Sequence, residues 1–84
     1  MLDSILNEIA NSVVLIDPND LVELRQLLEL INTIDEPDLD AQVFTLGDVT
    51  ERMILDDFDT PELAMQALNE AVIDLQEAYK RLTQ

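Results

Sequence analysis

Apolar residues recur at three- and four-residue spacing along most of the chain, as they do on amphipathic helices. The chain has one glycine and three prolines, and the prolines fall between the apolar segments, where helices begin or end. We therefore expect an all-α fold: a single domain over residues 1–84, built as a small bundle of about four helices with a long C-terminal amphipathic helix.

Two helices are expected before residue 35. The first, over about residues 3–16, carries one apolar face: Leu2, Ile5, Leu6, Ile9, Val13 and Ile16. The second is expected over about residues 18–34, with Asp17 as its N-cap and Pro18 at the first helical position. Its main apolar arc contains Leu21, Leu24, Leu27, Leu28, Ile31 and Ile34. Val22 and Leu30 lie outside that arc, and a helix with two apolar sides is either sandwiched within a fold or placed at an interface.

Residues 38–58 have the weakest pattern. Leu39, Val43, Phe44 and Leu46 fit either a short helix or a brief extended piece that ends at Gly47. A second short helix, beginning near Asp48, would then carry Val49, Met53 and Ile54.

The last segment has the clearest helical signal. Thr60 is a good N-cap, Pro61 fits the first helical position, and the helix would be about 33 Å long. Its stripe alternates by four and three residues: Ala64, Leu68, Ala71, Leu75, Ala78 and Leu82. The stripe is wider than a coiled-coil seam, so bundle core is the preferred interpretation. Self-association into a homodimer is the alternative, through Val22, Leu30, Leu68, Leu75 and Leu82.

The composition excludes most kinds of catalytic site. The chain contains no Cys, His or Trp, so it has no disulfide, no His or Cys nucleophile pair and no zinc site made of those side chains. The sequence does not fit an EF-hand calcium loop. The glycine that such a loop requires would be Gly47, and two of the positions that supply oxygen ligands would then be Phe44 and Leu46, which have no side-chain oxygen. Acyl-carrier proteins need a serine at the start of a helix in the middle of the chain. The only serines here are Ser4 and Ser12, near the N-terminus, so the sequence does not fit that class. We expect no enzyme activity, no metal and no cofactor.

Acidic residues dominate the middle of the chain. The formal net charge is −15, from 19 acidic and 4 basic residues. Residues 17–40 hold eight acids against Arg25, and residues 41–62 hold six against Arg52, which places −12 of the total there. Two clusters stand out: Asp35, Glu36, Asp38 and Asp40, and then Asp56, Asp57, Asp59 and Glu62. Turn formation and helix N-termini account for some of these acids, but not for the shortage of balancing bases.

Such a charge distribution excludes some partners and favours others. Four basic residues neutralise few phosphates, so direct nucleic-acid binding is not expected, and no segment is apolar enough for a membrane span. The N-terminal segment also lacks the positive charge of a signal peptide, so we expect a cytoplasmic protein. An acidic surface can instead occupy the basic groove of a nucleic-acid-binding protein, as small acidic inhibitors encoded by phages do.

The expected function is therefore non-enzymatic binding to a basic protein surface, in the manner of an inhibitor or decoy that mimics nucleic-acid phosphate. Both acidic clusters are the expected contacts. Phe58, between Asp57 and Asp59, is either an apolar anchor within the second cluster or a side chain packed under its own turn. The alternative function is a helical adaptor, subunit or assembly chaperone that acts through an apolar helix face.

Overall fold

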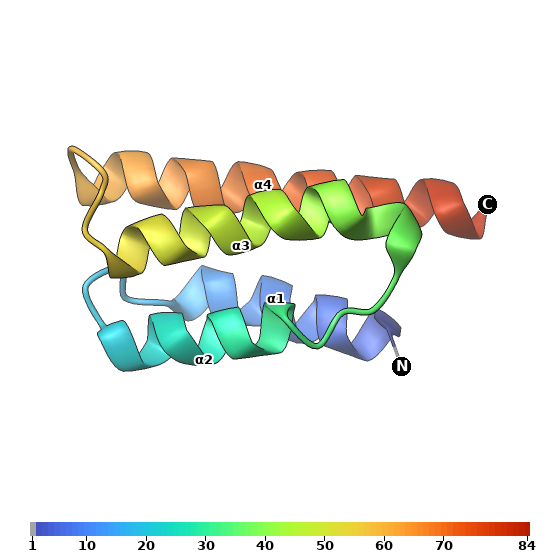
Figure 1. The fold of residues 1–84 in the computed structure, drawn as a ribbon, viewed down its shortest axis with the longest axis horizontal. Coiled ribbons are helices and arrows are strands. Elements are labelled where there is room, and N and C mark those ends of the chain that lie inside the picture. The colour runs from blue at the N-terminus through green and yellow to red at the C-terminus, as the bar shows by residue number, and fades with distance from the viewer. Residues whose placement is uncertain (1) are drawn as a thin grey trace.

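The computed structural model describes residues 2–84. In this part of the chain there are four α-helices, one short 3-10 turn and no strand: α1 (Leu2–Leu15), α2 (Leu21–Ile31), η1 (Pro37–Leu39), α3 (Asp40–Ile54) and α4 (Pro61–Thr83). Successive helices run in opposite directions and form an up-down-up-down bundle (Figure 1). The all-α bundle with a long C-terminal helix is therefore confirmed.

The core lies along the axis of the bundle, and every helix contributes to it. Ile9 of α1, Leu24 of α2, Leu46 of α3 and Leu68 of α4 are among its fully buried side chains. Thr50 is the one buried polar side chain in residues 2–84, and its hydroxyl donates to the Leu46 carbonyl oxygen at 2.8 Å. The stripe predicted on the last helix faces this core from Ala64 to Ala78, whereas its last member, Leu82, is exposed. α3 completes the core by packing between α2 and α4.

The start of α2 differs from the prediction. The helix begins at Leu21, and its N-cap is Asp20, whose carboxylate accepts from the backbone N–H groups of Val22 and Glu23 at 3.0 and 3.2 Å. Asp17 instead shapes the preceding turn, because its carboxylate accepts from the Asn19 N–H at 2.9 Å. The expected cap at Asp17 is wrong because that side chain is already engaged in the turn.

The predicted break at Gly47 is also wrong. α3 runs through it without interruption from Asp40 to Ile54. Leu46, Val49 and Met53 on one face of α3 are buried, and this burial outweighs the roughly 1 kcal/mol that a glycine costs within a helix. The continuity of α3 determines where the acidic clusters lie.

Replacing Gly47 by alanine is expected to raise the free energy of unfolding by about 0.5–1 kcal/mol, because alanine is the better helix former. A Cβ at this position would lie 3.9 Å from Leu28 Cδ1 and 4.0 Å from Ile31 Cγ2, which is ordinary van der Waals contact. Urea unfolding followed by circular dichroism measures the change. A less stable Gly47→Ala variant would show that α2 packs too closely to admit the methyl group.

Candidate functional site

The two predicted acidic clusters lie at opposite ends of the bundle. Residues 35–40 span the connection between α2 and α3 and the first residue of α3, at the end of the bundle where the chain terminates, whereas residues 56–62 span the connection between α3 and α4 and the start of α4 (Figure 1). The 15 residues of α3 separate the two connections by about 22 Å. A small partner can therefore contact only one of the two clusters, unless its binding surface extends along the length of α3.

The second cluster gains acids from another loop. The α1–α2 loop lies at the same end of the bundle, and Pro18 and Asn19 share a shallow cavity of about 80 Å³ with Phe58, Thr60 and Pro61. We call residues 17–23 together with residues 52–62 the acidic end. It holds seven carboxylates and a single basic residue: Asp17, Asp20, Glu23, Asp56, Asp57, Asp59 and Glu62, with Arg52.

Asp17, Asp20 and Glu23 were not among the predicted site residues. In an up-down-up-down bundle, the first and third loops meet at one end, and that rule is the signal that would have grouped them with the second cluster. All three also have a local structural role. The Asp17 N–H donates to the Glu23 carboxylate at 3.0 Å, so the side chain of Glu23 closes the α1–α2 turn.

A hydrogen-bonded turn fixes the backbone of the α3–α4 loop. The Asp56 N–H donates to the Met53 carbonyl and the Asp57 N–H to the Arg52 carbonyl, which is the Schellman pattern at a helix C-terminus. Asp56 takes a φ of 57°, a left-handed conformation that glycine and asparagine adopt more readily than aspartate. The loop thus presents consecutive carboxylates from a fixed backbone.

Arg52 is already engaged within this loop. Its Nε lies 3.3 Å from Asp57 Oδ2, and its guanidinium carbon lies 4.5 Å from the centre of the Phe58 ring. This is the one ion pair in residues 2–84, and both side chains are well exposed, so it contributes little to stability. Phe58 packs partly against the core beneath Arg52, which agrees better with a side chain packed under its own turn than with a free apolar anchor.

The other cluster lies in a mixed electrostatic environment. Asp35, Asp38 and Asp40 are exposed, and the Glu36 carboxylate accepts from the Asp38 N–H at 3.3 Å as the cap of η1. Lys80 and Arg81, in the last turn of α4, lie at the same end of the bundle (Figure 1). We call residues 35–40 together with this last turn the terminal end. Its four acids lie near two bases, whereas the seven acids of the acidic end have only Arg52 among them.

The residues predicted for self-association do not form one surface. Leu68 and Leu75 are buried in the core, so they are not available at the surface of the folded chain. Val22 and Leu82 are exposed, on different helices. Leu30 is partly buried and lines a groove of about 460 Å³ between α1 and α2, with Leu15 on its other side.

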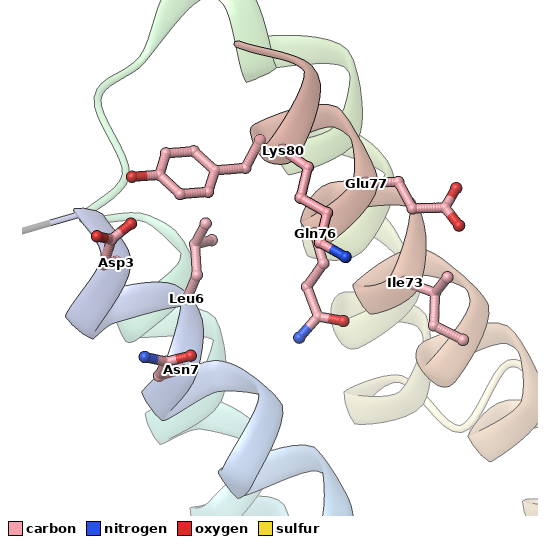
Figure 2. Close-up of a pocket in the computed structure, with 8 residues that line it drawn as sticks. Asp3, Leu6, Asn7, Ile73, Gln76, Glu77 and Lys80 are labelled. Atoms are coloured by element: carbon pink, nitrogen blue, oxygen red, sulfur yellow. The ribbon is translucent and has the colours of Figure 1, made fainter. Parts of the chain in front are cut away.

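A larger groove of about 540 Å³ lies between α1 and α4. Asp3, Leu6 and Asn7 line it from α1, and Gln76 reaches toward them from α4 (Figure 2). A hydrogen bond to the Asp3 carboxylate is the main cause that raises the pKa of Tyr79, which also lines this groove. The groove is open to solvent and mixes polar with apolar side chains, so it brings together no recognisable catalytic set.

Searches for similarity to known protein families, characterised proteins and solved structures found no match. Within residues 2–84, no three acidic side chains are grouped so that they could hold a metal ion. Over the same residues, no helix has both the length and the apolar character needed to cross a membrane.

Proposed function

We propose that this chain is a non-enzymatic acidic protein that binds a basic surface on another protein, and that the partner is a nucleic-acid-binding protein whose phosphate site it occupies. The acidic end carries the proposal. Its seven carboxylates come from two neighbouring loops and from the first turns of the helices that follow them, and its one basic residue is turned onto Asp57 and Phe58. A groove that binds nucleic-acid phosphate is positively charged, so it attracts the negatively charged acidic end.

Charge complementarity of this kind accelerates association and makes it sensitive to salt. A surface with unbalanced negative charge steers a basic partner toward it, and the attraction weakens as the Debye length falls. Residues 24–51 carry an excess equal to that of the acidic end, seven acids against Arg25, but these acids are spread along α2, α3 and the terminal end, where Lys80 and Arg81 lie nearby. Residues 2–16 contain only Asp3 and Glu8 as acids, and the acids of residues 63–84 are nearly balanced by Lys80 and Arg81. The acidic end is therefore the side on which a basic protein is expected to dock.

Two matched variants test the location of binding. The acidic-end variant neutralises four side chains, and the terminal-end variant neutralises four others, so each reduces the net charge from −15 to −11. The first combines Asp56→Asn, Asp57→Asn, Asp59→Asn and Glu62→Gln; the second combines Asp35→Asn, Glu36→Gln, Asp38→Asn and Asp40→Asn. We expect the first to weaken partner binding by about 10- to 100-fold at low salt and the second to weaken it far less.

Partner capture provides the measurement. The immobilised chain is exposed to a lysate of host cells at low salt, and bound proteins are released with rising sodium chloride or with duplex DNA. Release of nucleic-acid-binding proteins by moderate salt and by DNA supports the proposal. Equal losses in the two variants, at unchanged helicity, would contradict a site at the acidic end.

The apolar adaptor remains the second candidate, on a different surface. Val14 and Leu15, at the end of α1, are 80% and 82% exposed, and Leu15 adjoins the groove between α1 and α2. Exposed apolar side chains that adjoin a groove are typical of protein-binding surfaces. Partners that stay bound at about 1 M salt would favour this candidate, because such contacts are not screened.

A further inference from the structure

The outer face of α3 carries a line of exposed side chains that includes both acidic and apolar residues. Positions 40, 44, 48, 51 and 55 are spaced by four, four, three and four residues, so they follow one side of the helix and its C-cap. We call them the α3 stripe: Asp40, Phe44, Asp48, Glu51 and Leu55. All five are exposed, and the opposite side of α3 faces the core through Leu46, Val49, Thr50 and Met53.

Two features of the stripe favour a partner with both charge and apolar surface. Phe44 and Leu55 are 74% and 75% exposed, and three carboxylates share their side of the helix. The neighbouring base, Arg52, is held by Asp57 and Phe58 in the following loop. Nucleic-acid phosphate is purely anionic, so imitation of phosphate alone gives no reason for an exposed aromatic ring among the acids.

The spacing of the stripe defines the shape of the partner. Phe44 and Leu55 are eleven residues apart, which at about 1.5 Å per residue places them about 16 Å apart along α3. A helix that packs along α3 presents side chains at the same three- and four-residue intervals. Two apolar residues eleven positions apart on such a helix would meet Phe44 and Leu55, and basic residues between them would face Asp48 and Glu51.

We propose that the α3 stripe binds an amphipathic helix of the basic partner, with two apolar contacts and Lys or Arg between them. The proposal rests on the proposed function, because it names the element of the basic protein that docks. Nucleic-acid-binding proteins commonly place such a basic helix in the major groove. The stripe extends from the terminal end to the acidic end, so a helix bound on it would also bring basic flanks close to Asp56 and Asp57.

A labelled synthetic peptide provides the probe. It is an 18-residue helix with leucine at two positions eleven apart and lysine or arginine on the same face between them; a control peptide has the same composition with the leucines moved to the opposite face. Fluorescence anisotropy at low salt measures binding. We expect the patterned peptide to bind, and the double variant Phe44→Ala, Leu55→Ala to weaken its binding by about tenfold or more. The double variant Leu63→Ala, Ile73→Ala, which removes two exposed apolar side chains of α4, should leave binding unchanged.

The outcomes separate this inference from the proposed function. Equal binding of both peptides, with no effect of Phe44→Ala, Leu55→Ala but a loss in the acidic-end variant, would overturn the α3 stripe and leave the basic-surface proposal standing. No binding of either peptide at low salt would overturn both. Chemical-shift changes outside α3 and its flanking loops, or a dimer that dissociates in the Phe44→Ala, Leu55→Ala variant, would show that another surface or a second copy is the occupant.

Discussion

Raising the sodium chloride concentration from about 0.1 M to about 1 M is expected to increase the free energy of unfolding by on the order of 3–5 kcal/mol. The chain has a net charge of −15 and a radius of gyration of 12.1 Å. The ion pair between Arg52 and Asp57 is the one pair present in residues 2–84, so carboxylates repel each other with little internal compensation. Folding therefore brings negative charges closer together, and salt weakens the resulting repulsion, which otherwise destabilises the folded state.

The magnitude follows from the change in size on folding. An unfolded chain of this length has a radius of gyration of about 29 Å, so its charges are much farther apart than in the native bundle. The Debye length falls from about 10 Å to about 3 Å over this range of salt, which removes most of the repulsion that distinguishes the two states. Such a change is comparable to the whole stability expected of a small domain, about 3–5 kcal/mol.

Urea unfolding at several sodium chloride concentrations measures the effect, and the two neutralised variants provide the control. Each carries −11, and repulsion scales with the square of the net charge, so each should retain about half of the salt dependence. The two variants should agree with each other, because long-range repulsion depends on the total charge. A salt response that is flat, or that is unchanged in both variants, would show that self-repulsion does not limit the stability of this fold.

The sequence predicted the helices whose patterns are long and whose caps are unambiguous. Thr60 caps α4 as expected, with its hydroxyl oxygen accepting from the Leu63 N–H at 3.1 Å, and Pro61 opens the helix. Asp17 and Asp20 are both suitable caps, and only the turn that Asp17 forms decides between them. The low helix propensity of Gly47 suggested a break, and packing of its neighbours in the core overrides it.

The candidate site was less accessible to prediction, because it depends on topology. Both acidic clusters are visible in the sequence, but their separation to opposite ends follows from the uninterrupted course of α3. The same error concealed the α3 stripe. With a break assumed at Gly47, Phe44 and Leu55 belong to different elements, whereas in one helix they fall on one face. A correct prediction of α3 as one helix would therefore have placed Phe44 and Leu55 on one face, which composition and clustering of acids alone do not show.

Replacing Leu68 by alanine is expected to lower the free energy of unfolding by about 3–5 kcal/mol, the upper part of the range for buried leucines. Leu68 is fully buried, and its neighbours on the same stripe, Ala64 and Ala71, are buried as well. Alanine side chains are short and cannot move to fill the space, so the cavity persists and adds to the lost burial. The variant should be largely unfolded at low salt, where the charge repulsion is strongest.

Leu82→Ala is the matched control, since it removes the same atoms from the same helix at a position that is 44% exposed. We expect it to cost less than about 1 kcal/mol, because little buried surface is lost. Urea unfolding in about 1 M sodium chloride keeps the native baseline of Leu68→Ala measurable, and sedimentation gives the mass of each variant. If Leu68 held two copies together, its variant would instead be a folded, fully helical monomer derived from a dimer. If the Leu68→Ala chain is unfolded at low salt and refolds when salt is added, Leu68 belongs to the core of a single chain. That result would also connect the two predictions, because the cavity and the charge repulsion both lower the same small free energy of unfolding.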